Sequence, residues 1–306
     1  MMISLFFLYA LLAMSFTIGK MLLFYVTPIF LIAIRMSIAG TVILGMHYFM
    51  SRSKTKTSSF GIKSLADLKI LVLLSFIHIL IPYCSEFIAL EHIAPSCAAL
   101  MFNLTPFFSA FFSYLYFDEK MTFKKWLGFL IGLFGIGYFL EPTALSCAGL
   151  SSFYPYVLLL IAVVSCALGW IYVRILVKDR GYSPMFVNGF AMLLGGLLAF
   201  PISGMLEGPL AFPLESMRSF LTLLALIILV ANIIFYNLYG FFLKKYTATL
   251  LSFVGFITPA FVALFDWLFL EIYVSSGFFI ATAILGFGIY IFYQEELKQG
   301  YVAQNS

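Results

Sequence analysis

The side chains of this 306-residue chain that could do chemistry lie inside long apolar segments. His78, Pro82 and Glu86 follow one another at intervals of four residues, which places them on roughly one face of a helix. Pro82 removes a backbone hydrogen bond, so it bends the helix and frees a carbonyl group. We therefore predict that His78, Tyr83 and Glu86 line a cavity and bind a small molecule. A structural histidine, bonded to a neighbouring backbone carbonyl, is the alternative for His78.

Arg35 is another charged group within an apolar segment, about two turns from its start. A charge in apolar surroundings is costly, so it is expected to have a partner or a function. We expect Arg35 either to pair with a carboxylate such as Glu86 or to bind an anionic group of the small molecule.

Amides and aromatic rings complete the candidate binding site. Asn103, Asn232 and Asn237 lie near the middle of apolar segments, where an amide can hydrogen-bond a ligand or join two helices. Trp170 and Tyr236 occur at comparable depth, where a ring can stack on a planar or cationic ligand or pack against other rings. All five residues are predicted to contribute to substrate binding.

Sequence signatures of enzymes and metal sites are absent. Glu91 and His92 come nearest to a catalytic pair, but they lack partners at a useful spacing. Neither a nucleotide-binding motif nor a CxxC spacing occurs. We predict no catalytic residue, no cofactor and no metal. We expect the cysteines to be reduced packing residues, namely Cys84, Cys97, Cys147 and Cys166.

The composition indicates that membrane helices position these side chains. Hydrophobic residues make up 63% of the chain and charged residues 10%, with a mean hydropathy of +1.09, whereas soluble domains are about 25% charged. About 20 apolar residues span a bilayer, and the sequence predicts an all-α membrane protein with ten such helices. The predicted helices cover 3–23, 28–50, 69–90, 94–117, 123–140, 153–177, 184–204, 218–243, 247–270 and 275–293.

Basic residues determine the predicted orientation, because short basic loops stay in the cytoplasm. With the N-terminus inside, thirteen Lys and Arg residues fall on the cytoplasmic side, and the other side receives Lys20 and Arg218. Both termini are then cytoplasmic, in a multi-pass protein of the cell (inner) membrane. Topology explains these charges, so we expect no nucleic-acid partner. The thirteen are Arg52, Lys54, Lys56, Lys63, Lys69, Lys120, Lys124, Lys125, Lys178, Arg180, Lys244, Lys245 and Lys298.

An internal repeat divides the chain into two halves. A shift of 153 residues lays 104–118 on 257–271 with six identities, which include a Thr-Pro pair. Because each half has five helices, an odd number, the second half runs opposite to the first. Inverted repeats are typical of secondary transporters, whose binding site lies between the repeats near the midplane. We therefore predict two domains, 1–145 and 146–306, as inverted five-helix repeats around a central cavity.

The repeated segments resemble the drug/metabolite transporter superfamily, EamA branch. The first-half pattern is APSCAALMFNLTPFFSAFFSYLYFDEKMTFKKWLGFLIGLFGIGYF, and the second half has TATLLSFVGFITPAFVALFDWLFLE followed by GFGIYIF. The resemblance implies a basket of eight helices around the cavity, with the fifth and tenth set apart. It also implies amino acids, nucleoside-like metabolites such as S-adenosylmethionine, or organic cations as substrates. Asp118-Glu119 departs from the single Glu of the family, and we expect these acids and Glu271 to cap helix ends or bind loops.

These features favour a secondary transporter that moves a small organic metabolite by alternating access within a lipid bilayer. His78 and Glu86 can titrate, so the sequence leaves open whether transport is coupled to protons. It also leaves open whether the protein forms a homodimer. The alternatives from other classes are a membrane-embedded enzyme and a channel. An enzyme needs a catalytic set near the membrane face, and a channel needs a ring of polar pore-lining groups.

Overall fold

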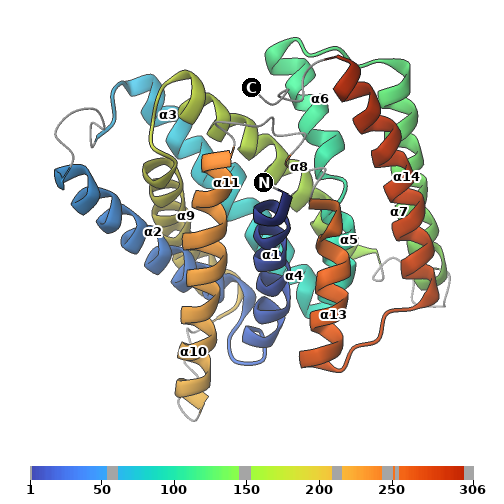
Figure 1. Ribbon diagram of the computed structural model, residues 1–306. Helices are drawn as coiled ribbons and strands as arrows, with labels where there is room; N and C mark the ends of the chain where they lie inside the picture. The colour runs from blue at the N-terminus through green and yellow to red at the C-terminus, as the bar shows by residue number, and fades with distance from the viewer. Residues whose placement is uncertain are drawn as a thin grey trace.

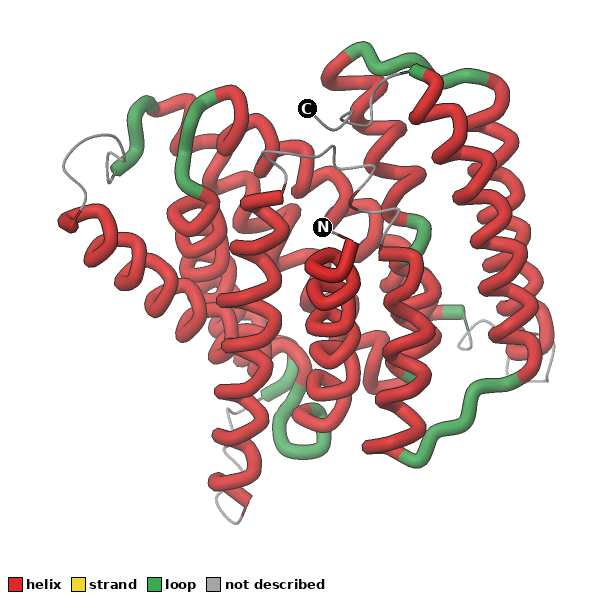
Figure 2. The backbone as a smooth tube through the Cα atoms, viewed as in Figure 1, coloured by secondary structure: helices red, strands yellow, loops and turns green. Residues whose placement is uncertain are grey.

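The computed structural model describes residues 2–53, 61–144, 153–208, 216–242, 251 and 255–299, and within these ranges the chain is helical, with no strand. The helices form a bundle, with α7 and α14 as a pair along one side of it (Figures 1 and 2). The elements in chain order are α1 (Met2–Leu22), α2 (Pro28–Ser53), α3 (Leu65–Leu74), η1 (Ser75–Leu80), α4 (Ile81–His92), α5 (Pro95–Phe102), α6 (Thr105–Phe117), α7 (Phe123–Ala144), α8 (Tyr154–Arg174), η3 (Ile175–Asp179), α9 (Pro184–Leu206), α10 (Met217–Ile227), η5 (Ile228–Phe235), α11 (Tyr236–Phe242), η6 (Gly255–Ile257), α13 (Thr258–Leu270) and α14 (Ser276–Lys298).

The lengths and hydropathy of the helices are those of a multi-pass membrane protein. Seven segments of the described chain are long and apolar enough to cross a membrane, and two shorter apolar helices cover Phe6–Leu22 and Gly255–Leu270. Each of the ten predicted ranges contains helix, although 243, 247–250 and 252–254 lie outside the described residues. The seven are Pro28–Ser51, Leu65–His92, Pro95–Phe117, Tyr154–Asp179, Pro184–Leu206, Met217–Phe242 and Ser276–Glu295.

π-Helical turns interrupt two of the predicted helices, and the predicted helix 153–177 ends in the π-helical η3. The third comprises α3, the π-helical η1 and α4, with Pro82 shortly after η1. The eighth comprises α10, the π-helical η5 and α11. In a π-helical turn each carbonyl accepts a hydrogen bond from the N–H group five residues later, instead of four. The extra residue changes the faces to which the following side chains point. His78 lies in η1 and Asn232 in η5, so neither follows the regular α-helical pattern.

The two Thr-Pro segments share one local structure. α6 and α13 have 13 residues each, begin at the threonine and carry the proline as the second residue. Proline costs little there, because the first N–H groups of a helix lack intrahelical partners anyway. Both helices end at an acid with left-handed backbone, Asp118 at φ 53° and Glu271 at φ 55°, so the acids occupy the expected cap positions. α6 ends at the upper edge of the molecule and α13 at the lower edge (Figure 1).

Glycine lets two pairs of helices approach closely. A Cβ atom on Gly40 of α2 would stand 2.3 Å from the backbone nitrogen of Leu193 in α9. A Cβ atom on Gly128 of α7 would stand 2.6 Å from the carbonyl oxygen of Gly288 in α14. Small residues are usual at such contacts, because van der Waals packing drives the association of membrane helices. The α7–α14 pair matches the fifth and tenth helices that the family resemblance sets apart.

Three contacts join residues that stand 153 positions apart, which is the spacing of the sequence repeat. When a twofold axis relates two segments, residues near the axis contact their own equivalents. A twofold relation between the predicted halves, 1–145 and 146–306, would place such contacts near its axis. The contacts are the 2.7 Å hydrogen bond of Tyr83 with Tyr236, the 3.4 Å hydrogen bond of Asn103 with Phe256, and the approach of Gly40 to Leu193.

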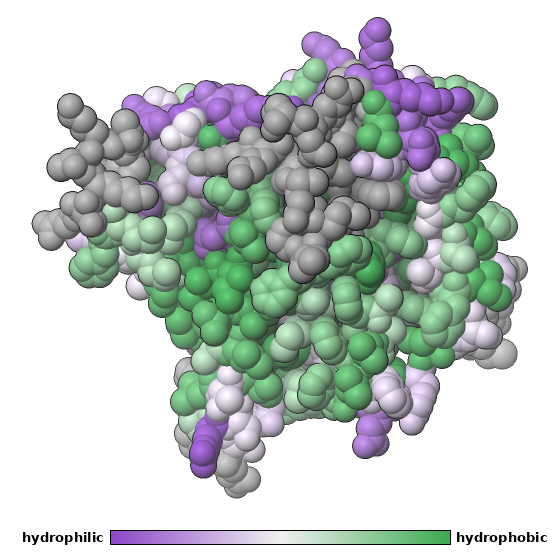
Figure 3. Space-filling model, viewed as in Figure 1, coloured by the Kyte–Doolittle hydropathy of each residue, from purple (hydrophilic) through white to green (hydrophobic). Residues whose placement is uncertain are grey.

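The surface has an apolar middle and hydrophilic edges. Figure 3 shows hydrophobic side chains across the centre of the visible face, hydrophilic side chains mainly along the upper edge, and a few at the lower edge. Large apolar side chains on this surface are exposed, for example Leu130 at 60% and Phe279 at 62%. A bilayer supplies the apolar surroundings that such side chains need.

Gly40→Ala should lower the thermal unfolding temperature of the purified protein in detergent. The added methyl group meets backbone atoms of α9, and overpacking of this kind costs about 1–3 kcal/mol. Gly45→Ala on the same helix is the matched control, because a Cβ atom there would meet nothing within 4 Å. Equal unfolding temperatures for the two variants would contradict the close α2–α9 contact.

Candidate functional site

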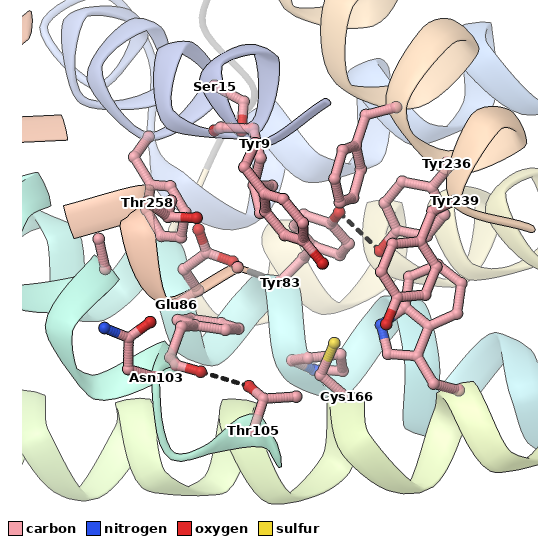
Figure 4. Close-up of a pocket in the computed structure, with 18 of the residues that line it drawn as sticks. Tyr9, Ser15, Tyr83, Glu86, Asn103, Thr105, Cys166, Tyr236, Tyr239 and Thr258 are labelled. Carbon is pink, nitrogen blue, oxygen red and sulfur yellow. Dashed lines mark hydrogen bonds between the residues drawn. The ribbon is translucent and has the colours of Figure 1, made fainter. Parts of the chain in front are cut away.

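A cavity inside the bundle is lined by side chains from both predicted halves of the chain, 1–145 and 146–306. The space that no protein atom fills measures about 870 Å³, part of it open to solvent. In Figure 4, Tyr236 and Tyr239 lie on one side of the cavity, and Glu86, Asn103 and Thr258 lie on the other. The lining residues are Tyr9, Leu12, Ser15, Phe16, Arg35, Pro82, Tyr83, Glu86, Ala99, Phe102, Asn103, Thr105, Cys166, Trp170, Phe235, Tyr236, Tyr239, Gly255 and Thr258.

Aromatic rings form one side of the cavity. The ring centroid of Trp170 is 4.1 Å from that of Tyr239 and 5.3 Å from that of Tyr236. The Tyr83 hydroxyl donates a 2.7 Å hydrogen bond to the Tyr236 hydroxyl, which joins α4 to α11. Three helices thereby hold a surface, here called the aromatic wall (Tyr83, Trp170, Tyr236 and Tyr239), on which a planar or cationic group can stack.

His78 lies behind the aromatic wall and not in the cavity lining. Its ring packs edge-on against Trp170 at a centroid distance of 4.4 Å and lies 5.5 Å from Tyr236. His78 is 1% exposed, and neither ring nitrogen has a hydrogen-bond partner among the described residues. A Cβ atom on Gly169 would stand 2.2 Å from His78 Nδ1, so glycine is what admits the ring. The contacts indicate that His78 supports the wall.

Arg35 lines the cavity and is held from behind by Asn232. Its Nε donates a 2.8 Å hydrogen bond to Asn232 Oδ1. Asn232 is 0% exposed, and its Nδ2 lies 3.2 Å from the sulfur of Met36. The Arg35 guanidinium carbon is 5.2 Å from the ring centroid of Tyr83 and 5.6 Å from that of Phe87, within the range of cation–π attraction. The helix that carries Asn232 therefore fixes the direction of Arg35.

Glu86 faces the same cavity and is 8% exposed. In the part of the chain that the structure describes, no group forms a hydrogen bond with its carboxylate, and no ion pair joins it to Arg35. The expected pairing of Arg35 with Glu86 is not formed as a direct ion pair among the described residues, and the Arg35 Nε bonds the amide of Asn232. A guanidinium group and a carboxyl group thus line one cavity without a direct bond between them.

The other predicted amides differ in position. Asn103 lines the cavity, is 4% exposed, and donates through Nδ2 to the Phe256 carbonyl. Asn237 donates a 2.8 Å hydrogen bond to the Ile233 carbonyl one turn earlier and is not part of the lining. The structure thus brings six of the nine predicted site residues to the cavity, namely Arg35, Tyr83, Glu86, Asn103, Trp170 and Tyr236, whereas His78, Asn232 and Asn237 lie outside the lining.

Polar contacts close the bundle beyond one end of the cavity. Asp266 of α13, 0% exposed, accepts hydrogen bonds from Thr17 Oγ1 at 3.1 Å and from the Ser96 backbone nitrogen at 2.9 Å. Lys20 Nζ donates to the carbonyl of Leu90. These contacts join α1, α4, α5 and α13 near the last turns of α1 and α4. We name them the Asp266 closure.

Hydroxyl groups of α1 line the cavity without having been predicted from the sequence. Tyr9 donates a hydrogen bond to the Leu251 carbonyl, and Ser15 donates to the Leu12 carbonyl at 2.6 Å. The chain contains 18 tyrosines, and nothing in the spacing of Tyr9 distinguishes it from the others. Only the packing of α1 against the rest of the bundle identifies these residues.

Three cysteines are free thiols, Cys84, Cys97 and Cys166, and Cys147 lies outside the described residues. Cys166 lines the cavity, so it is not only a packing residue between helices. Within the described ranges, no group of three or more His, Cys, Asp and Glu residues could hold a metal ion.

Known proteins resemble this chain along nearly its whole length. The model of the EamA-like transporter family matches residues 1–140 and 153–294. Two proteins named S-adenosylmethionine/S-adenosylhomocysteine transporter, from Chlamydia muridarum and Chlamydia trachomatis serovar L2, are each 31% identical over 292 residues. The match covers 94% of this chain and 90% and 87% of those proteins. A solved crystal structure, 19% identical, covers 97% of this chain and 96% of its own with a TM-score of 0.63, which supports the fold alone.

Asn232→Leu should destabilise the protein by about 1–3 kcal/mol, because it leaves the buried Nε of Arg35 without an acceptor. The measurement is thermal unfolding in detergent. Asn237→Leu is the matched control, since its amide bonds only a carbonyl of its own helical segment. A loss of stability in Asn237→Leu as large as in Asn232→Leu would contradict the role assigned to Asn232.

Proposed function

The chain belongs to the EamA-like transporter family, and from this premise we propose that it exchanges S-adenosylmethionine for S-adenosylhomocysteine across a membrane by alternating access. One observation of the structure carries the proposal: an aromatic wall, a guanidinium group and a carboxylate face the same cavity. The relatives named for these two compounds match 94% of the chain, which supports the choice of substrate.

The chemical groups of S-adenosylmethionine fit those of the cavity. Its adenine ring can stack on Trp170 and the tyrosines beside it, and its sulfonium cation is attracted to aromatic faces. Asn103, Ser15 and Thr258 offer amide and hydroxyl groups for the ribose and the adenine edge. S-Adenosylhomocysteine lacks only the methyl group and the sulfonium charge. A cavity that recognises the shared groups binds both compounds, as exchange requires.

We infer that the chain is built of two inverted halves, residues 1–145 and 146–306, each with five membrane helices. The family model matches two separate stretches, and three contacts join residues 153 positions apart. α6 and α13, which have the same local structure, end at opposite edges of the molecule (Figure 1). The ten helices would be the seven long apolar segments, the two shorter ones and α7. Such halves can exchange conformations, which opens the cavity to either side in turn.

The positions of basic residues support a cytoplasmic location for both termini, in the cell (inner) membrane. Hydrophilic side chains gather along the upper edge in Figure 3, where α3 and α7 begin and α6 ends. Lys54, Lys56, Lys244 and Lys245 of the predicted cytoplasmic set, and the side chain of Arg52, lie outside the described residues. With this orientation α1 runs outward, so the Asp266 closure lies on the outer side.

A membrane-embedded enzyme and a channel are the alternatives from other classes. No catalytic set stands beside Glu86 among the described lining residues, which favours a transporter without enzymatic activity. Within the transporter class, free amino acids and organic cations are alternative substrates. Coupling of transport to protons is a further element of the proposal, which transport measurements would test. Formation of a homodimer is another, which mass measurements would test.

Proteoliposomes loaded with S-adenosylhomocysteine should take up labelled S-adenosylmethionine faster than empty ones, and the rate should saturate with concentration. Trp170→Ala should lower the affinity for both substrates about tenfold, because stacking of a base on an aromatic ring contributes about 1–3 kcal/mol to binding. Trp267→Ala, on α13 and 50% exposed, is the matched control and should transport as the unchanged protein does.

The same assay separates the alternatives. Conversion of the labelled compound into a product would indicate an enzyme, and flux that rises linearly without saturation would indicate a channel. Uptake that is independent of internal S-adenosylhomocysteine would contradict exchange. If Trp267→Ala lost as much activity as Trp170→Ala, the aromatic wall would not be the stacking surface.

A further inference from the structure

We propose that Arg35 and Glu86 together bind the α-amino-acid group of the substrate, with Arg35 on its carboxylate and Glu86 on its ammonium group. This inference rests on the proposed function and deepens it, because it says which chemical group decides affinity. The recognised class is any small molecule with a free α-amino-acid end and an aromatic body.

Arg35 is held so that part of its guanidinium group remains for a ligand. Its Nε is bonded to Asn232, and its plane lies near the rings of Tyr83 and Phe87. The described residues offer no acceptor to its two terminal nitrogens, although Arg35 is only 1% exposed. Arg35 lines the cavity, so its terminal nitrogens are the part of the guanidinium group that a ligand there can bind. A guanidinium fork presented in this way suits a carboxylate, which it can bind through two parallel hydrogen bonds.

Glu86 offers the complementary charge from the same turn of α4 that contacts Arg35. The helix places Glu86 next to Phe87 and three residues after Tyr83, the two rings beside the guanidinium group. Its carboxylate accepts no hydrogen bond from the described residues and lines the cavity. An ammonium group supplies three donors and a positive charge, which an isolated carboxylate binds well.

The presence of two oppositely charged side chains in one cavity favours a zwitterionic ligand. Charges in apolar surroundings are costly unless they are paired and hydrogen-bonded. Arg35 and Glu86 interact electrostatically but form no direct ion pair, so a ligand that carries both opposite charges can contact each of them. The carboxylate and ammonium groups of an α-amino acid are attached to one carbon atom, so both can be reached from two neighbouring helices.

The placement also explains how one cavity can accept both exchange partners. The amino-acid group is identical in S-adenosylmethionine and S-adenosylhomocysteine, whereas the sulfur differs in charge. Recognition of the shared group by Arg35 and Glu86, with a tolerant aromatic wall for the remainder, binds both compounds. It rejects 5′-methylthioadenosine, which has the nucleoside and the thioether but no amino-acid group.

The test is binding to the purified protein in detergent, measured by calorimetry with matched ligands. S-Adenosylhomocysteine should bind at least about tenfold more tightly than 5′-methylthioadenosine, because each charge-assisted hydrogen bond contributes about tenfold or more. Glu86→Gln should lower the affinity for S-adenosylhomocysteine at least about tenfold. Its affinity for an analogue that lacks the amino group should stay within about twofold of that of the unchanged protein. Arg35→Gln should also lower the affinity for S-adenosylhomocysteine at least about tenfold, and should leave the affinity for decarboxylated S-adenosylmethionine nearly unchanged.

Control variants make the same chemical changes away from the cavity. Glu91 on α4 and Arg218 on α10 are both exposed. The variants Glu91→Gln and Arg218→Gln should bind the ligands as the unchanged protein does. Because Arg35→Gln also disturbs Asn232, its unfolding temperature is measured without ligand. Glu86→Gln keeps the inference testable if that variant fails to fold, since Glu86 makes no hydrogen bond among the described residues.

The outcomes separate the inference from the proposed function. Equal binding of S-adenosylhomocysteine and 5′-methylthioadenosine, or equal loss for all ligands in Glu86→Gln, would overturn the roles of Arg35 and Glu86 while the exchange of the two substrates still stood. Binding of free methionine that depends on both residues, without binding of either nucleoside, would overturn the proposed substrates and uphold the amino-acid site. Binding of none of these compounds would overturn both.

Discussion

Arg35 is a charged side chain at 1% exposure in a chain that is 63% hydrophobic, and its position constrains the helices around it. A buried guanidinium group needs acceptors for its hydrogen bonds, because an unmade bond in apolar surroundings costs more than a made one returns. Asn232 accepts one of these bonds from the π-helical η5, and the rings of Tyr83 and Phe87 on α4 lie within cation–π range of the charge. α2, α4 and η5 therefore have to converge at this point, and the cavity lies where they do.

The packing of the helices makes that convergence possible. α2 approaches α9 at Gly40, and α7 approaches α14 at Gly128 and Gly288, so backbone meets backbone without intervening side chains. The Tyr83–Tyr236 hydrogen bond and the Gly40–Leu193 contact each join residues that stand 153 positions apart. In the proposed inverted halves these contacts lie along the axis, where the relative motion of the halves is smallest. The Asp266 closure lies away from it, at an end of the cavity that alternating access has to open.

The candidate site could be predicted in part, because depth within a helix can be read from the sequence and direction cannot. Arg35, Glu86 and Trp170 stand out by their positions within apolar segments, and they line the cavity. His78 and Asn232 also lie within apolar segments, but in π-helical turns, and neither belongs to the lining. Both residues hold cavity side chains in place: His78 packs against Trp170, and Asn232 bonds Arg35.

The membrane class, the helical segments and the acids at their ends follow from local patterns, because hydropathy, proline and chain length act locally along the chain. The cost of placing charges in the apolar segments also follows from these patterns. Which group bonds Arg35 depends on the tertiary fold. The acceptor stands 197 residues away in the chain, and no local pattern distinguishes an amide on a distant helix from the carboxylate of Glu86. The same holds for Tyr9, which lines the cavity because α1 packs where it does, and not because of its neighbours in sequence.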